Sequence, residues 1–415
     1  MFMVQIFKIP WASWYEPKEL EMEFPDSWDI QLFDVEDITA IKDEVEIRKI
    51  LNNPIDTPPI SELANGKKNA VIVVDDISRH TKTEAILKVV LSELNQAGIE
   101  DKNITLILAL GGHRPMTRQD FIKKIGLSIL ERINVKNHHP FLNLKYLGDS
   151  KLGTPIYVNQ TYYESELKIT IGGVIPHALA GFGGGAKIIL PGVCGIQTLE
   201  ANHSASVRGA GVGLGYITEL RRDIEDVCSR VGLDFSINII PTIDGSPAGI
   251  FAGHFVKAHR EAIKLLRKIY EIKIPSKTKF DVVFFNAYPE DTELSQSSKA
   301  LNTYLLNPKL VSYRGAVVIL SASTEGRGYH SLSGETGASL YKNPEEDIIF
   351  STFGKRKILF YSPNVTQADM EHFYPKSVIF ENDFKNIISK LEQLFGDKIK
   401  AGIIQTSIQL PKKID

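Results

Sequence analysis

The sequence predicts an α/β protein with two α/β domains, each built on a mostly parallel sheet. Short apolar runs of strand length alternate with amphipathic helical segments from about residue 69 almost to the end of the chain. A chain of 415 residues is also longer than a single hydrophobic core usually organises. We expect right-handed crossovers between parallel strands and an interdomain active-site cleft as the default place for a ligand.

The first half of the chain supplies the elements of the first expected domain. The first 65 residues show no clear periodicity, and prolines between residues 54 and 59 would break a long element. Residues 81–84 (Thr-Lys-Thr-Glu) have capping-box spacing, which predicts a helix that ends before Gly98. A second helix is expected to open near Thr117, and residues 244–247 (Asp-Gly-Ser-Pro) are typical of a turn. The expected strands are 69–75, 104–110, 167–171, 236–240 and 250–252.

The second half repeats the alternation after a helix expected at 255–269. Residues 274–277 (Ile-Pro-Ser-Lys) are the best linker candidate. The expected elements beyond it are strands 281–285, 316–320, 357–361 and 403–408, and helices 295–305 and 383–394. We therefore expect an N-terminal domain at 1–272, a C-terminal domain at 273–400, and a closing strand within 401–415 that could return to the first domain.

Composition excludes several classes of protein. Lys and Arg total 48 against 50 Asp and Glu, so no overall field favours nucleic acid or an anionic membrane. No apolar run reaches the ~20 residues of a membrane span, and the N-terminus lacks the pattern of a secretory signal. Two cysteines, Cys194 and Cys228, cannot form a disulfide scaffold or a Cys-rich metal site. We expect a cytoplasmic protein with a small-molecule partner, no nucleic acid and no membrane.

Three loops follow expected strands directly and carry polar side chains. They span residues 75–79, 111–114 and 172–177, and they contain Arg79, His113 and His177. Because ligands bind outside the carboxyl ends of strands in open α/β sheets, these side chains are candidates for acid–base catalysis and anion binding. The alternative is that each histidine caps a helix or bonds a loop carbonyl.

The glycine-rich segment 181–187 (Gly-Phe-Gly-Gly-Gly-Ala-Lys) is the least ordinary part of the sequence. Gly183, Gly184 and Gly185 allow the backbone to approach a bound cofactor closely. A phosphate-loop NTPase is disfavoured because Ile188 stands where that motif needs a hydroxyl, and the contiguous glycines do not fit a dinucleotide fingerprint. Lys187 remains open as a phosphate clamp, a covalent anchor or a solvated lysine.

Two further histidine positions are less informative. A single histidine such as His203 cannot make a protein-only metal site, and no paired His–carboxylate spacing surrounds it. His138 and His139 precede Pro140, so we expect them in a surface turn without a catalytic role.

Taken together, these motifs resemble the lactate racemase family, whose members use a nickel-pincer nucleotide. The resemblance is specific because the histidines and lysines occur together at the family's mutual spacings, and weaker similarity covers most of the chain. The matching motifs are Asp76-Ile77-Ser78-Arg79, Gly112-His113-Arg114, His177 with Lys187 ten residues later, Ala201-Asn202-His203-Ser204, and Gln296 with Lys299.

The resemblance implies a cofactor and residues that hold it. The cofactor is nickel in a pyridinium-3,5-bisthiocarboxylic acid mononucleotide, and the family's covalent lysine matches Lys187. His203 matches the protein's ligand to nickel, which would explain how one histidine suffices, and Asp76 matches a residue near the cofactor. Loading would require separate cofactor-synthesis enzymes as partners.

The resemblance also implies an isomerase, a racemase or epimerase that inverts C2 of a 2-hydroxy acid by reversible hydride transfer. Residues that match His113 and His177 act as acid–base catalysts. Residues that match Arg79, Gln296 and Lys299 hold the carboxylate of the substrate.

One position departs from the family pattern. Ser295 stands where lactate racemase carries a tyrosine directly before the glutamine. The loss of an aromatic wall would leave room for a longer or more polar substrate, malate-like or aldonate-like, and Arg327 or His330 could meet its second polar group. The alternative from another class is a non-catalytic nickel- or nucleotide-binding protein that carries the cofactor. Retention of both His113 and His177 argues against it, since binding alone needs no acid–base pair.

Overall fold

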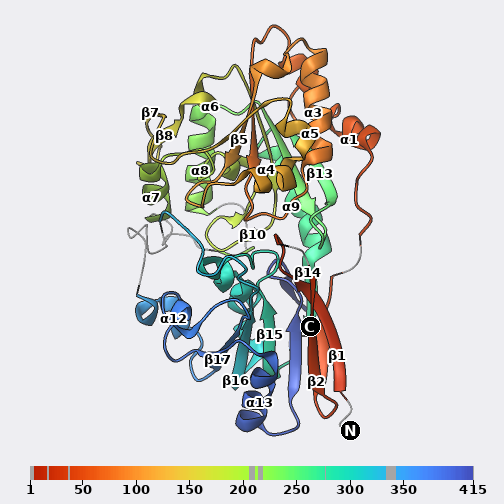
Figure 1. The fold of residues 1–415 in the computed structure, drawn as a ribbon, viewed down its shortest axis with the longest axis vertical. Coiled ribbons are helices and arrows are strands. Elements are labelled where there is room, and N and C mark those ends of the chain that lie inside the picture. Colours follow the sequence, from red (N-terminus) through yellow and green to blue (C-terminus); the bar gives the residue numbers. More distant parts are fainter. Residues whose placement is uncertain are drawn as a thin grey trace. The chain divides into compact units, whose positions relative to one another are not determined.

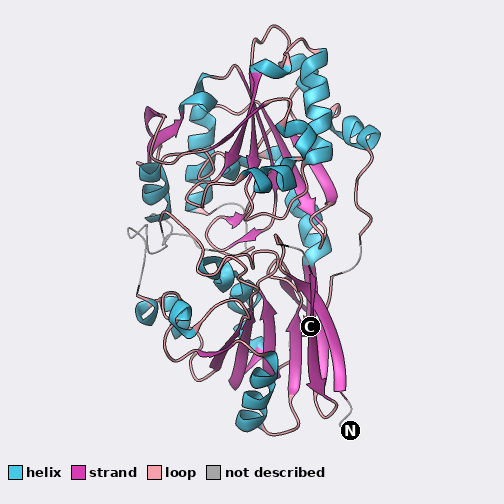
Figure 2. Cartoon of the chain, viewed as in Figure 1, coloured by secondary structure: helices cyan, strands magenta, loops and turns pink. Residues whose placement is uncertain are grey.

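A computed structural model describes residues 4–15, 18–35, 38–204, 211–213, 218–275, 277–332 and 343–414. The chain forms two compact units, which we call the central unit (Asp37–Lys268) and the terminal unit (Met1–Glu36 with Ile269–Asp415). Each unit combines a six-stranded sheet with helices (Figure 2). The predicted class, α/β with mostly parallel sheets, is confirmed.

The sheet of the central unit has the strand order β13-β12-β9-β4-β5-β6. Every neighbouring pair is parallel except the β12–β13 hairpin. All six residues of β4 are buried, as expected for a strand covered on both faces. The strands are β4 (Ala70–Asp75), β5 (Ile104–Ala109), β6 (Asn134–Asn137), β9 (Leu167–Gly173), β12 (Phe235–Pro241) and β13 (Pro247–Gly253).

The order in which the chain adds strands to this parallel sheet reverses between β4 and β9. The chain runs from β4 outward to β5 and β6, then returns to β9 and runs outward the other way to β12. The loops after β4 and β9 therefore flank a topological switch point, where α/β sheets usually bind ligands. Helices lie on both sides of the sheet (Figure 1). They are α3 (Glu84–Gln96), α4 (Arg118–Ile125), α5 (Leu127–Leu130), α6 (Gln160–Glu164) and α8 (Glu219–Val231).

Other elements complete the central unit. The helices are α1 (Glu44–Leu51), α2 (Ile60–Leu63), η1 (Asp101–Asn103), η2 (Gly185–Ile188), α7 (Ile196–Ser204) and α9 (Lys257–Tyr270). The short strands are β7 (Leu144–Asp149) with β8 (Pro155–Asn159), and β10 (Pro176–His177) with β11 (Gly181–Phe182). Helix α4 opens after Thr117, as predicted, and Thr117 caps it in a capping box with Asp120. The capping box predicted at 81–84 is wrong, because Thr81 donates its hydroxyl to Asp75 instead.

The terminal unit contains a fully parallel sheet of order β18-β17-β16-β15-β19-β3. A hairpin of β1 (Val4–Trp11) and β2 (Lys18–Pro25) and a parallel pair of β14 (Glu271–Pro275) and β20 (Leu410–Ile414) accompany it. The sheet strands are β3 (Asp29–Phe33), β15 (Phe280–Asn286), β16 (Val311–Leu320), β17 (Lys357–Tyr361), β18 (Ile379–Glu381) and β19 (Lys400–Ile404).

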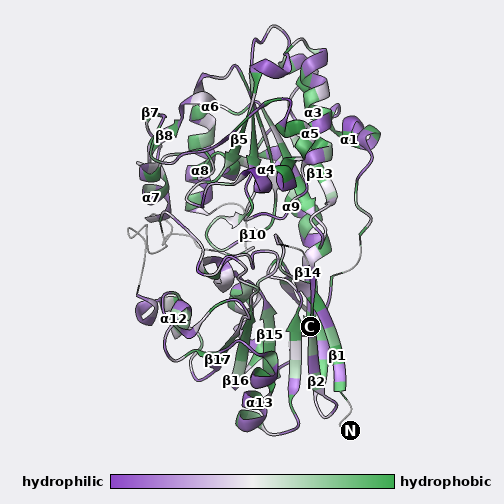
Figure 3. Cartoon of the chain, in the orientation of Figure 1, coloured by the Kyte–Doolittle hydropathy of each residue, from purple (hydrophilic) through white to green (hydrophobic). Residues whose placement is uncertain are grey.

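Alternate residues of these strands build two cores, one on each face of the terminal sheet. Phe284 packs edge-on against Phe24 of β2, with ring centroids 5.3 Å apart, whereas Phe285 faces Tyr304 on the other side. The strands are accordingly mostly hydrophobic (Figure 3). The helices are η4 (Leu294–Leu301), α10 (Asn302–Leu306), η5 (Pro308–Leu310), η6 (Pro344–Glu346), α11 (Ile348–Ser351), α12 (Gln367–Met370) and α13 (Phe384–Phe395).

The division of the chain differs from the predicted domains at 1–272, 273–400 and 401–415. The N-terminal residues are not irregular, since they supply the β1–β2 hairpin and β3, which pairs with β19 in the terminal sheet. The closing strand β19 pairs with both β15 and β3, so it lies in the terminal unit, to which residues 29–33 of the predicted N-terminal domain also belong. The linker candidate at 274–277 begins inside β14. Among the helices that the structure describes, none is long and apolar enough to cross a membrane.

His138 contradicts the prediction of a surface turn, whereas its neighbour His139 is exposed. His138 is 2% exposed and donates Nε2–H to the carbonyl of Cys194 at 2.9 Å. Burial lowers the pKa of His138 to about 4, although the Cys194 carbonyl works in the opposite direction. The ring is therefore neutral in the folded protein over most of the accessible pH range.

We expect the free energy of unfolding to fall as the pH decreases from 6.5 to 4, because the unfolded His138 ring binds a proton that the buried ring does not. One such group contributes a slope of up to ~1.4 kcal/mol per pH unit. His138→Gln should flatten the urea-unfolding stability profile in this range, whereas the exposed control His139→Gln should keep it. Equal slopes in wild type and His138→Gln would contradict the account.

Candidate active site

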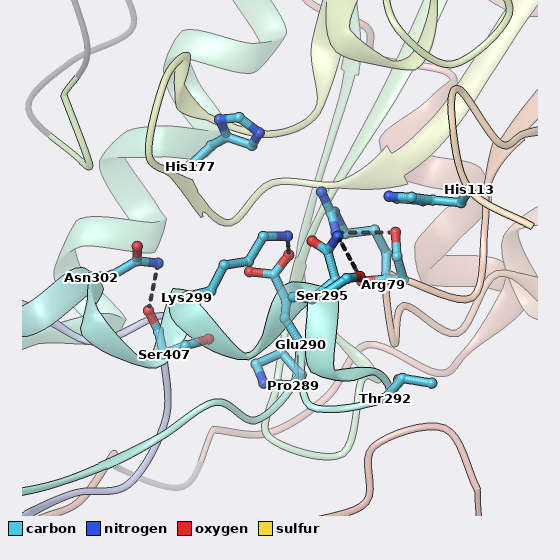
Figure 4. Close-up of polar contacts among 12 residues, drawn as sticks. Arg79, His113, His177, Pro289, Glu290, Thr292, Ser295, Lys299, Asn302 and Ser407 are labelled. Atoms are coloured by element: carbon cyan, nitrogen blue, oxygen red, sulfur yellow. Dashed lines mark hydrogen bonds and ion pairs between the residues drawn. The ribbon is translucent and has the colours of Figure 1, made fainter. Parts of the chain in front are cut away.

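The candidate site of the central unit lies at the carboxyl ends of β9, β4 and β5, which are neighbours in the sheet. The loops after these strands carry Arg79, His113 and His177, so the predicted convergence at one sheet edge is confirmed within this unit (Figure 4). Each of these three side chains is half-buried.

Two adjacent aspartates at the end of β4 have different tasks. Asp75 points into the fold, where it accepts the Thr81 hydroxyl at 2.7 Å and the backbone amide of Gly173 at 2.8 Å. Lys124 places its ammonium 2.6 Å from the same carboxylate. Asp76 points the other way, toward His113. Asp75 is therefore a structural residue and Asp76 belongs to the site.

Asp76 orients the imidazole of His113. The Asp76 Oδ2 atom lies 2.6 Å from His113 Nδ1, and the carboxylate can only accept, so Nδ1 carries the proton. In the neutral ring Nε2 then keeps its lone pair and can act as a base. Burial alone would raise the pKa of Asp76, but His113, the Ser78 hydroxyl and Arg79 hold it well below its usual range. Asp76 is thus a charged partner throughout the neutral range.

Arg79 is held by its own loop. Its Nη1 donates to the carbonyl of Ser78 at 2.9 Å and to the Ser78 hydroxyl at 3.1 Å. The Ser78 hydroxyl in turn donates to Asp76. This chain of bonds fixes the guanidinium beside the Asp76–His113 pair, where it can bind an anion.

His177 has the opposite tautomer from His113. Its Nδ1 accepts the backbone amides of Leu179 at 3.1 Å and Ala180 at 3.2 Å, so the proton of the neutral ring lies on Nε2. That nitrogen is 3.2 Å from the Nζ atom of Lys187, which is 8% exposed. The pairing brings His177 and Lys187 together, as their shared loop suggested.

The glycine segment does not form a cradle of amides for an anion. The carbonyls of Ala180, Phe182 and Gly184 accept bonds from Arg221, and that of Gly183 accepts one from His259 at 2.7 Å. Gly184 and Gly185 have φ of +70° and +58°, and a Cβ on Gly184 would lie 2.5 Å from Val174. The glycines therefore serve close packing and left-handed backbone. The predicted contacts of Gly183, Gly184 and Gly185 with a cofactor stay predictions.

His203 lies near the end of α7 and is half-buried. Its Nδ1 donates to the carbonyl of Leu199 at 2.8 Å, which leaves the lone pair of Nε2 available to a metal. Burial, and then the charge of Lys187, lower the pKa of His203 to about 4, so the ring is neutral at pH 7. A neutral imidazole with a bonded second nitrogen is the form that binds metals.

The donor set limits what this part of the protein could hold. Among the described residues no three His, Cys, Asp or Glu side chains gather as a metal site. The single imidazole of His203 therefore fits a metal that arrives with its other ligands on a cofactor, and the nearby amine of Lys187 fits the anchoring of such a cofactor. The residues present are compatible with the nickel-pincer nucleotide.

The terminal unit carries the remaining candidates on the segment after β15. Ser295, Gln296 and Lys299 are partly exposed on η4, while Ser297 and Ala300 face the core. Lys299 forms an ion pair with the buried carboxylate of Glu290 (Figure 4). This partner was not predicted, and it fixes the ammonium while offsetting its charge.

Ser295 also has an acidic neighbour that sequence reasoning missed. Its hydroxyl donates to Glu293 Oε1 at 2.5 Å, and the other oxygen of Glu293 accepts the amide of Tyr329 at 3.3 Å. Arg327 lies with its Nε 3.1 Å from Asp369 and donates from Nη1 to His372 at 2.9 Å. Its charge is thus balanced by a carboxylate, and His330 accepts the amide of Leu332 at 3.1 Å.

Arg221 and His259, which support the glycine segment, were also missed. A signal for Arg221 was available, since it lies on the same face of α8 as Ile224, Cys228 and Val231, where a charge is unexpected. No comparable signal marks His259, because its role depends on a contact between α9 and a loop far away in sequence.

Comparisons with known proteins show similarity to lactate racemases. Residues 15–214 match the family model described as the lactate racemase N-terminal domain. The chain is 28% identical over 294 residues to the lactate racemase of Thermoanaerobacterium thermosaccharolyticum, which covers 69% of this chain and 68% of that protein. It is 26% identical over 302 residues to the lactate racemase of Lactiplantibacillus plantarum, with 71% and 70% covered.

Two solved structures share the fold. The lactate racemase apoprotein of T. thermosaccharolyticum superposes with a TM-score of 0.75 at 23% identity and covers 99% of this chain and all of that one. A protein from Thermotoga maritima gives a TM-score of 0.65 at 17% identity over 91% of this chain.

We expect the His113 ring to carry its proton on Nδ1 as long as the Asp76 carboxylate is present. Nitrogen-15 NMR of the ring should show this tautomer in wild type and in Ser78→Ala, which removes a donor to Asp76 but keeps its charge. Asp76→Ala should lose it, because no acceptor then holds the Nδ1 proton. An unchanged tautomer in Asp76→Ala would show that Asp76 does not orient the ring.

Proposed function

Because the chain is similar to lactate racemases, which are isomerases, over most of its length, we propose that it inverts the configuration at C2 of a 2-hydroxy acid. The observation that carries the proposal is the pair of differently held histidines at one sheet edge. His113 keeps a lone pair on Nε2, whereas His177 presents a proton on Nε2. Inversion needs a base and an acid on a planar intermediate, and a protein that only carried a cofactor would need neither.

We propose that the chain binds the nickel-pincer nucleotide through Lys187, covalently, and through His203 as the protein ligand to nickel. When bound, this group supplies an acceptor for the C2 hydride, which permits inversion without an external redox partner. Burial keeps the His203 ring neutral, its Nδ1–H bond to the Leu199 carbonyl leaves Nε2 as the ligand atom, and Lys187 is buried beside His177. Asp76 is held charged near this site, where it keeps His113 oriented.

The hydroxyl proton of the substrate goes to Nε2 of a histidine in the base form. For one enantiomer we assign this step to His113, because Asp76 stabilises the ring after it gains the proton. His177 serves the other enantiomer when its neutral ring carries the proton on Nδ1 instead, which frees the Nε2 lone pair and means that Nδ1 gives up the bonds from Leu179 and Ala180. Arg79, Gln296 and Lys299 hold the carboxylate through charge-assisted and amide hydrogen bonds.

The surroundings of Ser295 favour a hydroxylated substrate over a dicarboxylate. Glu293 accepts the Ser295 hydroxyl, so the pair offers oxygen lone pairs and a negative charge next to Gln296. A second carboxylate would be repelled there, whereas sugar-acid hydroxyls could donate. Arg327 offers little compensation because Asp369 already pairs with it. We therefore place aldonate-like acids before malate-like ones.

Two variants separate the roles proposed for the cofactor residues. Lys187→Ala should abolish the covalent adduct, whereas His203→Ala should keep the adduct and lose nickel, since it removes one ligand only. Intact mass and nickel content per chain of protein produced with the cofactor-synthesis enzymes measure both. The controls Lys151→Ala and His139→Ala change exposed side chains and should retain both. An unmodified Lys187 in active protein would overturn the covalent assignment.

A panel of lactate, malate and aldonates tests the reaction and its selectivity together. We expect racemisation or epimerisation, with kcat/KM highest for an aldonate. Glu293→Gln should shift the ratio of malate to aldonate kcat/KM by about tenfold toward malate, the effect of roughly one charge-assisted bond. Ser295→Ala should weaken aldonate use without helping malate. Turnover of no member of the panel would contradict the proposed function, and an unchanged ratio in Glu293→Gln would contradict the selectivity argument only.

A further inference from the structure

Helix α8 carries two buried charged residues close together in sequence, Arg221 and Asp223, with exposures of 0% and 1%. Two residues along an α-helix are separated by about 200° around its axis, so these side chains leave the helix on opposite sides. The side chain of Arg221 reaches the glycine segment and η2, and that of Asp223 reaches α7. One helix therefore contacts both segments that carry the proposed cofactor residues.

On one side, Arg221 donates to the carbonyls of Phe182 and Gly184 in the glycine segment and to that of Ala180, directly before the segment. A guanidinium can satisfy several acceptors at once because its donors form a rigid planar fork. Burial, countered by Glu225, lowers the pKa of Arg221 to about 10, so it stays charged at neutral pH. The bonds fix the backbone that leads directly into Lys187.

A second contact supports the same segment from α9. The Glu225 carboxylate accepts a hydrogen bond from the Arg260 guanidinium. Arg260 also donates to Nδ1 of His259 at 2.9 Å, and His259 donates Nε2–H to the carbonyl of Gly183 at 2.7 Å. Glu225 lies one turn after Arg221 on α8, so the helix anchors this chain of bonds as well.

On the other side, Asp223 collects three donors. It accepts the hydroxyls of Ser150 at 2.5 Å and Thr154 at 2.6 Å, and the side-chain amide of Asn202 at 2.7 Å. Asn202 is fully buried and directly precedes His203. The bond from Asn202 to Asp223 therefore fixes the end of α7 from which the His203 ring projects.

We propose that α8 is a brace that sets the position of Lys187 relative to His203, with Arg221 and Asp223 as positioning residues for the two ends. The inference rests on the proposed function, which assigns Lys187 and His203 to the cofactor. A ligand held at both Lys187 and His203 requires a fixed separation between them, and neither side chain sits on the other's element. Direct bonds from one helix to both segments provide that separation without contacting the ligand.

Amide hydrogen exchange of the cofactor-free protein tests the brace without any activity. Arg221→Lys keeps the charge but loses the fork, and should speed exchange in residues 176–187 by about tenfold, or ~1.4 kcal/mol, while α7 stays near wild type. Asp223→Asn should do the reverse, loosening α7 and sparing 176–187. Controls on the same helix are Arg222→Lys, which is exposed, and Asp226→Asn, which pairs with Arg230 near the surface.

Protein produced with the cofactor-synthesis enzymes gives a second measurement, in which the two variants should again have different effects. Arg221→Lys should reduce the adduct on Lys187, whereas Asp223→Asn should reduce nickel per adduct. If Asp223→Asn fails to fold, Asn202→Ala breaks the same link from α7 and should give the same nickel loss. Exchange that is unchanged in both variants, or raised equally in both segments, would overturn the brace. Wild-type protein without adduct or nickel would instead contradict the proposed cofactor, and the exchange result would still decide the brace.

Discussion

The carboxylate of Asp75 is the constraint on which the architecture of the central unit's site depends. It ends β4, accepts the amide of Gly173, the last residue of β9, and pairs with the buried ammonium of Lys124 on α4. Lys124 also donates to the carbonyl of Arg79 at 2.8 Å. Removal of one partner from a buried ion pair costs roughly 3–5 kcal/mol. These contacts hold in register the loops that carry Asp76, Arg79 and His177.

In this site, backbone groups and carboxylates determine which nitrogen of each histidine carries the proton. His113 and His177 are the same residue type, yet a carboxylate holds one and two amides hold the other, so they present opposite groups to a ligand. Burial keeps the ring of His203 neutral, and the Leu199 carbonyl fixes its proton on Nδ1. The proposed inversion at C2 follows from this asymmetry together with the similarity to lactate racemases. The proposed brace formed by α8 explains how a glycine-rich segment can keep a fixed backbone.

Much of the fold could be predicted because buried parallel strands are continuous apolar runs. The strand β17 was predicted with its observed bounds, and β4, β5 and β15 to within a residue. The β1–β2 hairpin was missed because exposed residues, several of them charged, alternate with more buried ones. The two strands therefore do not form the continuous apolar runs that mark buried parallel strands. The assignment of β3 to the terminal sheet depends on pairing with β19, far away in sequence, which no local pattern records. The segment η4 was predicted as an α-helix but is a 3₁₀ helix. The two helix types place Gln296 and Lys299 on one face, so this sequence pattern does not distinguish them.

The site was predictable where strand ends and motifs coincide, and unpredictable where long-range partners decide. His113, His177 and Arg79 follow neighbouring strands, so topology alone brings them to one edge. Glu290 offsets the charge of Lys299, and Glu293 accepts the hydroxyl of Ser295. No sequence pattern predicted these two partners, because their bonds form only in the folded turn. His138 was placed at the surface by its proline neighbour, but the carbonyl of Cys194 gives it a buried partner.

The fate of the hydrogen at C2 tests the central claim most directly. One enantiomer of a 2-hydroxy acid that this protein turns over, deuterated at C2, is incubated with loaded protein in ordinary water, and both product enantiomers are examined by mass spectrometry. If C2 is inverted by hydride transfer, the opposite enantiomer forms with its deuterium retained. Formation of an opposite enantiomer that has lost deuterium to solvent would mean that the histidines remove the C2 hydrogen as a proton, and would contradict the account.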